Sequence, residues 1–137
     1  MERLVADTNA IAAAIIRDGV SRRIIFLPVI NFFAPDFMQA ELEEHRQEFV
    51  AKSKLTEEQY EKAVQAVLAN ITQMPAASYL PFKKEAIETS PDHDDWPFFA
   101  VALCLGCPLW SNEKRLAMQE KVEIVSTAGL LKRFGVE

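Results

Sequence analysis

The chain has 137 residues, 50% of them hydrophobic and 26% charged, which is an ordinary composition for one globular domain over residues 1–137. The longest strongly apolar run, residues 97–108, is too short to cross a bilayer, and no signal peptide is visible. We therefore expect a cytoplasmic protein with no membrane partner. The net charge of −5 argues against a protein that simply coats nucleic acid, but it allows an enzyme whose acids gather in one site.

The first two predicted elements meet at a carboxylate. An apolar strand over residues 3–6 stops at Asp7, and an Ala- and Ile-rich helix over residues 9–17 follows. Ligands bind at the carboxyl ends of the strands in a parallel sheet, so Asp7 is placed for use in a site. Thr8 and Asn9 are candidate caps of the helix, and a second interpretation is that Asp7 itself only helps to cap it.

A strand over residues 31–35 precedes a predicted helix over residues 37–50 that carries a carboxylate on its apolar face. The stripe consists of apolar or aromatic side chains at helical spacing: Met38, Leu42, His45 and Phe49. Glu41 lies inside this stripe, where an ionised carboxylate is costly unless it is paired or binds a metal. Two alternatives stay open: Glu44 could take its place, or Glu41 could reach the edge and pair with a basic residue.

The rest of the chain continues the alternation of helices and strands. Helices are expected at 57–70, 98–105, 114–119 and 128–134, and strands at 71–74, 108–111 and 123–126. This order predicts an α/β/α sandwich with a central parallel sheet of four to five strands.

Three aspartates occur within four positions, just before the 98–105 helix: Asp92, Asp94 and Asp95. Their charges repel one another if they pack closely. Pro97 suits the first helical position, so Asp95 should lie at or just before the helix N-terminus. His93 lies among these acids and could act as a general base or a ligand.

The strand at 108–111 is followed by Asn112 and Glu113, which repeats the order of strand, carboxylate and helix found at Asp7. Basic residues occur as adjacent pairs, and the simplest interpretation of any one pair is solvated surface. Together they could line a phosphate track around an acidic centre. The pairs are Arg22-Arg23, Lys83-Lys84, Lys114-Arg115 and Lys132-Arg133.

Cys104 and Cys107 have the C-x-x-C spacing, but Cys104 falls in the last turn of an apolar helix and not at a helix start. We therefore expect buried, unreactive core thiols and not a redox pair. A zinc site would need two further ligands, for which only His45 and His93 are available. The chain has four glycines and no glycine-rich phosphate loop.

As a set, these segments resemble a PIN domain. The resemblance is carried in order, over nearly the whole chain, by VADTN at residues 5–9, Pro35 with Glu41-Leu42, DHDDWPFFAVAL at 92–103 and PLWSNEKRL at 108–116. Members of this family are metal-dependent ribonucleases, and many are toxins of VapBC-type toxin–antitoxin pairs. The resemblance implies RNA as the substrate, Mg²⁺ or Mn²⁺ as the cofactor, an antitoxin protein as a partner, and a homodimer.

The resemblance also implies roles for individual residues. Asp7, Glu41 and Asp95 match the three most regular acids of the family, and Glu113 stands where an aspartate is usual. We expect Asp7 and Asp95 to be principal metal ligands, Glu41 a ligand or water-orienting group, and Glu113 an outer or second-metal ligand. Supporting roles are expected for Thr8, Asn9, Ser111, Asp92 and Asp94, and RNA contacts for Arg22, Arg23, Lys114 and Arg115.

The chemistry follows from the acids themselves. Two carboxylates 4 Å apart repel by roughly 4 kcal/mol at an effective dielectric constant near 20, so converging acids favour a bound divalent cation. A water on that ion can attack a phosphodiester in line. Two alternatives are a stand-alone RNA-processing nuclease, and a degenerate PIN-like module that binds RNA or protein without cutting. The longer arm of Glu113 favours the second of these.

Overall fold

The computed structural model describes residues 2–135. Its centre is a five-stranded sheet in the order β3-β2-β1-β4-β5, with every neighbouring pair parallel. The strands are β1 (Glu2–Ala6), β2 (Ile30–Pro35), β3 (Ile71–Met74), β4 (Leu109–Trp110) and β5 (Ile124–Val125). The predicted parallel sheet is confirmed.

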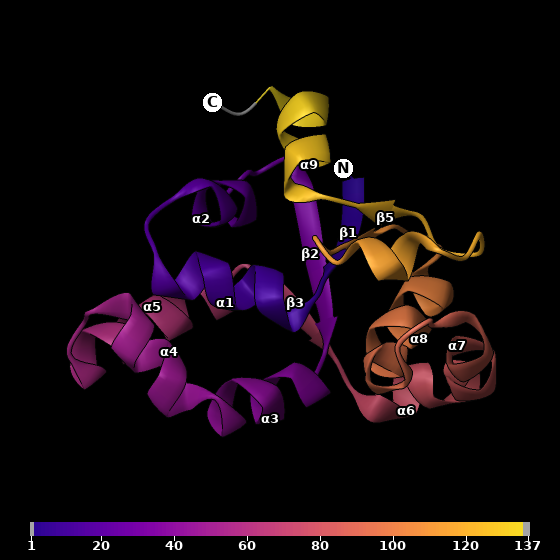
Figure 1. The fold of residues 1–137 in the computed structure, drawn as a ribbon, viewed down its shortest axis with the longest axis horizontal. Coiled ribbons are helices and arrows are strands. Elements are labelled where there is room, and N and C mark those ends of the chain that lie inside the picture. The colour runs from indigo at the N-terminus through magenta and orange to yellow at the C-terminus, as the bar shows by residue number, and fades with distance from the viewer. Residues whose placement is uncertain (1, 136–137) are drawn as a thin grey trace.

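Helices flank this sheet, as the predicted α/β/α architecture requires. In Figure 1, α1, α2, α4 and α5 lie to the left of β1 and β2, and α6, α7 and α8 lie to the right. The α-helices are α1 (Thr8–Ile16), α2 (Val20–Ile25), α3 (Phe37–Glu44), α4 (Arg46–Ser53), α5 (Glu57–Leu68), α6 (Ala76–Tyr79), α7 (Lys83–Thr89), α8 (Trp96–Leu105) and α9 (Thr127–Phe134). Short 3-10 helices are η1 (Leu80–Phe82), η2 (His93–Asp95) and η3 (Lys114–Ala117).

Helix α8 is central to the core. Its residues 97–102 are buried, and it packs against β1, β2 and β4. Because this helix is apolar all round, it is stable only with neighbours on most of its faces, as its sequence predicts. Gly106 ends it in the left-handed conformation, with φ of 63°, which glycine adopts without a steric cost. Because α8 packs against three strands, its N-terminal end, which follows Asp95, has a fixed position relative to the sheet.

The predicted helix over residues 37–50 is wrong in its continuity. It breaks at His45, where φ is −102° and ψ is 14°, and His45 is exposed instead of lying in the buried stripe. Tertiary contacts hold the start of α4 against α5: Arg46 lies 2.8 Å from Glu61 and 5.3 Å from the ring centroid of Tyr60. Helical spacing within one segment contains no information about these contacts.

Two further expectations need correction. The segment after Glu113 forms the 3-10 helix η3 and not an α-helix to residue 119. Cys104 and Cys107 are half-buried free thiols, so neither is fully buried as expected, although Cys107 packs against the core. Burial still raises the pKa of Cys107, which keeps its thiolate form scarce. Among the described residues, no helix combines the length and apolar character that a membrane span requires.

Candidate metal centre

Two neighbouring strands bring the first parts of the site together. Ala6 of β1 pairs with Trp110 of β4, and the Asp7 amide donates a hydrogen bond to the Trp110 carbonyl at 3.1 Å. Asp7 and Ser111 therefore leave the carboxyl edge of the sheet side by side. The position expected for Asp7 from the strand pattern is the one that the structure has.

Asp7 caps α1 and also faces the acidic site. One oxygen of its carboxylate accepts a hydrogen bond from the Ala10 amide at 2.8 Å, so Asp7 is the N-cap, and the suggestion that Thr8 or Asn9 caps this helix is wrong. Only 8% of Asp7 is exposed. Burial raises its pKa, although hydrogen bonds from Ser111 and Ala10 oppose the rise. A buried carboxylate with a raised pKa is poised to gain a cation.

Glu41 on α3 lies across from the start of α1. The Thr8 hydroxyl donates to its carboxylate at 2.6 Å, while the Asn9 side chain is exposed on the first turn. Burial raises the pKa of Glu41, the charges of Asp7 and Glu44 add to the rise, and the Thr8 hydrogen bond lowers it. Within residues 2–135 no Lys or Arg pairs with Glu41, so the alternative in which it reaches a basic partner is not found.

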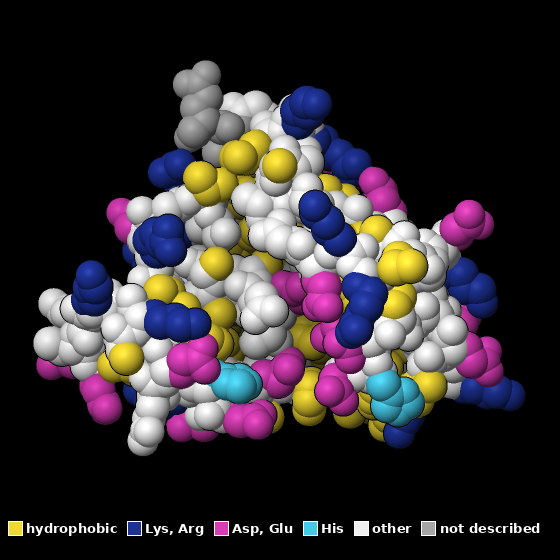
Figure 2. Space-filling model, viewed as in Figure 1, with side chains coloured by type: hydrophobic (Ala, Val, Ile, Leu, Met, Phe, Trp, Pro, Cys, Tyr) yellow, Lys and Arg dark blue, Asp and Glu magenta, His cyan; other side chains and the backbone are white. Residues whose placement is uncertain are grey.

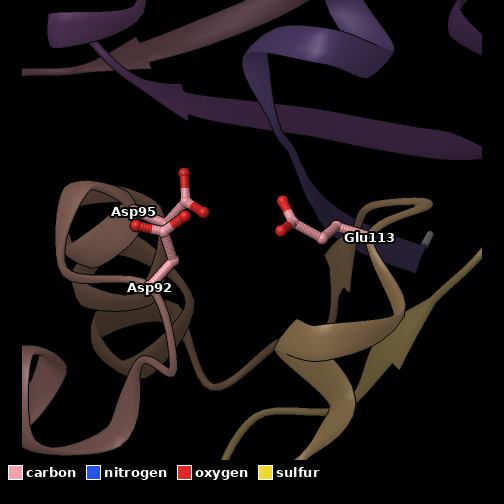
Figure 3. A group of neighbouring side chains, drawn as sticks. All are labelled: Asp92, Asp95 and Glu113. Carbon is pink, nitrogen blue, oxygen red and sulfur yellow. The ribbon is translucent and has the colours of Figure 1, made fainter.

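The most compact group of carboxylates consists of Asp92, Asp95 and Glu113. One oxygen from each lies within 4.8 Å of the others. Figure 3 shows Asp92 and Asp95 on the segment that leads into α8, with Glu113 facing them from the loop after β4. We call these three residues the acidic trio.

A 3-10 turn explains why Asp92 joins Asp95 in the acidic trio. The Asp95 amide donates to the Asp92 carbonyl at 3.1 Å, and side chains three residues apart in this helix type lie above one another. Asp94 is exposed, and its amide donates to the Asp92 carboxylate at 3.0 Å. The exposed His93 also stays outside the trio. From sequence, Asp92 is expected only in a supporting role, and its spacing of three residues from Asp95 is the signal that could place it in the trio.

The pKa of Asp95 reports how the acids surround it. Burial, followed by the charges of Asp92, Asp7, Glu113 and Glu41, raises its pKa from 3.8 to about 7. Each of these acids therefore disfavours a negative charge on Asp95. Asp95 also forms no side-chain bond to the α8 N-terminus that would compete for its oxygens. Segments far apart in the sequence thus concentrate negative charge around one carboxyl group.

Glu113 reaches this group from a loop that is fixed at both ends. Its amide donates to the Ser111 hydroxyl at 3.1 Å, and the neighbouring Asn112 side chain accepts from the Thr127 amide at 2.7 Å. The Glu113 side chain itself is exposed. The methylene that distinguishes glutamate from aspartate does not prevent Glu113 from joining the acidic trio.

The basic residues expected near the site differ in their placement. Arg115 lies 2.8 Å from Asp92 and 3.8 Å from Glu113, and Lys114 is exposed beside it. The Arg22 guanidinium donates to the carbonyls of Ala14 and Ile15 at 2.8 and 2.9 Å. Arg22 therefore stabilises the C-terminal end of α1. We do not assign it to an RNA surface. Arg23 is exposed on α2.

The ligand chemistry of this site suits a hard divalent cation. The acidic trio offers carboxylate oxygens as ligands. Asp7 and Glu41, whose charges also act on Asp95, offer further carboxylate oxygens. Mg²⁺ and Mn²⁺ prefer such ligands together with water, whereas softer metals prefer His and Cys. Figure 2 shows acidic side chains grouped near the middle of this face, with Lys and Arg on both sides.

Comparison with known protein families identifies a match over most of the chain. A family model described as PIN domain matches residues 5–127, a range that includes the acidic trio together with Asp7 and Glu41. No curated protein matches the sequence.

Proposed function

We propose that this chain, which belongs to the PIN-domain family, is a ribonuclease that depends on a divalent metal. A PIN domain is a nuclease-type fold, and the chain has a cluster of three acids that could bind metal. The observation that carries the proposal is the gathering of Asp92, Asp95 and Glu113, whose carboxylate oxygens lie within 4.8 Å of one another. Burial, followed by the charges of Asp92, Asp7, Glu113 and Glu41, raises the pKa of Asp95 to about 7. Such crowding is unfavourable in the protein alone and becomes favourable when a cation is bound.

The proposed roles follow from the contacts of each side chain. Asp7 and Asp95 are the principal ligands, and the hydrogen bond from Thr8 orients Glu41 as a ligand or as a water-positioning group. Asp92 and Glu113 complete the ligand set or hold a second ion. When bound, Mg²⁺ or Mn²⁺ supplies an activated water and neutralises charge that develops on the phosphate. Ser111 is a positioning residue, because its hydroxyl accepts a hydrogen bond from the Glu113 amide.

Two measurements test this proposal together. Single-stranded RNA should be cut in Mn²⁺, EDTA should stop cleavage, and added Mn²⁺ should restore it. Calorimetric titration should show Mn²⁺ binding that Asp95→Asn weakens at least about tenfold, because one charged ligand is lost. A protein that binds RNA, does not cut it and takes up no Mn²⁺ would instead be a degenerate PIN-like module.

Arg115 gives a further prediction, since it occupies the side of the site where Asp92 and Glu113 meet. Arg115→Gln should raise the affinity for Mn²⁺ about two- to fivefold, because an exposed ion pair of modest strength no longer competes with the ion. Lys114→Gln is the matched control, since it removes the same charge from the adjacent exposed residue. Equal changes in both variants would contradict specific competition by Arg115.

The toxin role is a finer proposal that rests on the family resemblance. Its partner would be a small antitoxin protein encoded by an adjacent gene, and the two proteins should purify as a complex without RNA cleavage. If no such gene lies beside this one, a stand-alone RNA-processing enzyme is the better proposal. The proposed homodimer is tested by light scattering of the purified chain.

A further inference from the structure

A groove on the α1–α2–α4 side of the molecule is basic, although the protein as a whole is acidic. It has a volume of about 680 Å³, and its lining includes Arg17, Arg23 and Lys52 together with the apolar Ile16 and Val20. These residues come from the end of α1, from α2 and from α4, and α1 packs against both of the other helices. The net charge of the chain is −5, so three cations around one groove are a local reversal of sign.

The cations of this groove are available to a ligand. Within residues 2–135, Arg17 and Arg23 form no ion pair, and both are exposed. Lys52 pairs with Glu48 at 2.8 Å, but both side chains are more than half exposed, so a stronger anion can replace Glu48 at little cost. Asp18 is exposed in the loop beside Arg17 and is not part of the lining.

The end of α1 would by itself repel an anion, because the carbonyls of a helix C-terminus carry partial negative charge. The Arg22 guanidinium offsets this charge by binding the carbonyls of Ala14 and Ile15. Arg22 thus offsets the charge of these carbonyls although it does not line the groove. The local field at the groove is therefore set by cations.

Helix α1 joins this groove to the metal centre. Asp7 caps its first turn, and the exposed residues that follow at four-residue spacing are Asn9, Ala13 and Arg17. Ten residues at about 1.5 Å of rise each place Arg17 roughly 15 Å from Asp7 along the helix axis. Between Asp7 and Arg17, helix α1 carries no acidic side chain that would repel a phosphate backbone. Figure 2 shows several Lys and Arg side chains to the left of the central acidic group, over the region where Figure 1 places α2 and α4.

We propose that this basic groove binds the phosphodiester backbone of a single RNA strand, which then follows the exposed face of α1 to the acidic metal centre. The proposal rests on the proposed ribonuclease function for the choice of ligand. Guanidinium groups bind phosphate oxygens through paired N–H donors, and the small side chains of Asn9 and Ala13 leave space for a strand. The groove supplies affinity, and the metal centre supplies the chemistry.

The test measures RNA binding without metal, so that it does not depend on catalysis. Fluorescence anisotropy of a labelled single-stranded RNA of about 12 nucleotides is recorded in EDTA between about 50 and 200 mM salt. The groove variant is Arg17→Gln with Arg23→Gln. The control variant, Lys62→Gln with Lys84→Gln, removes the same charge from exposed positions on α5 and α7. Lys52→Gln is added as a single exposed change, in case the double groove variant does not fold.

The slope of log affinity against log salt is negative, and each lost phosphate contact should reduce its magnitude by about 0.7. We expect a decrease of about 1.4 in the double groove variant, about 0.7 in Lys52→Gln, and a smaller change in the control. A groove variant with the slope of the parent protein would overturn the proposal. The proposal would also be overturned if the groove variant lost binding to polyglutamate while its RNA binding stayed unchanged, because that result would assign the groove to an acidic protein partner. If the slope falls but no RNA is ever cut, the groove stands and the nuclease proposal fails.

Discussion

Replacement of Asp7 by asparagine should abolish Mn²⁺-dependent RNA cleavage and leave the fold intact. Asparagine caps a helix about as well as aspartate, so the hydrogen bond from the Ala10 amide is kept. What is lost is a buried charge that the metal needs. If that charge is worth about 4 kcal/mol in the transition state, the rate falls on the order of 10³-fold. Single-turnover cleavage of a labelled RNA measures the rate, and thermal unfolding measures the fold.

The control for this variant is Asp94→Asn. It removes the same charge within the same acidic segment, but Asp94 is exposed and lies outside the acidic trio. We expect its cleavage rate to stay within about threefold of the parent, since exposed charges near a site act weakly. Full activity in Asp7→Asn, or equal losses in both variants, would show that Asp7 has no special place in the chemistry.

The stability of the metal-free protein should fall as the pH rises from about 4 to about 7. In this range the folded protein holds a proton on Asp95, whose pKa is raised from 3.8 to about 7, while the unfolded chain does not. The folded state therefore binds more protons, and the free energy of unfolding decreases with increasing pH. Asp7 and Glu41, whose pKa values are also raised, act in the same direction. Asp95 is partly buried, and its contribution is about 1–2 kcal/mol after solvent screening.

Mn²⁺ should reverse this loss of stability at high pH. At one hundred times its Kd, the ion adds about 2.7 kcal/mol to the free energy of unfolding, and at pH 5 it adds much less because Asp95 holds a proton. Urea unfolding at pH 5 and pH 8, with and without Mn²⁺, measures both effects. Asp95→Asn should flatten the pH dependence of the metal-free protein and weaken the response to Mn²⁺. The explanation fails if Asp95→Asn follows the parent at both pH values.

Much of the fold could be predicted from local signals. The alternation of apolar strands with helices indicated a parallel sheet, and the Pro97 and Gly106 positions bounded the central helix α8 within two residues. Those signals work because strand pattern, capping and glycine conformation depend on neighbours in the sequence. The break at His45 could not be predicted in this way, because it accompanies contacts between Arg46 and α5.

The candidate site, like the fold, could be predicted from the sequence only in part. Asp7, Glu41, Asp95 and Glu113 could be selected from sequence, since each is a carboxylate beside a buried segment at an element boundary or on an apolar face. Their roles as ligands stay predictions. The closeness of Asp92 to Asp95, the Thr8–Glu41 hydrogen bond and the Arg115–Asp92 ion pair came only from the structure.

The sequence by itself determined which residue types carry charge and where each stands on its own strand, helix or turn. The tertiary structure decided which of these charges share a space, because the strand order β3-β2-β1-β4-β5 places the ends of β1 and β4 together and brings α8 and α3 beside them. It also decided that Arg22 fastens a helix end while Arg17, Arg23 and Lys52 line one groove. Electrostatic interactions depend on distance in space, and distances between remote segments are fixed only when the chain has packed.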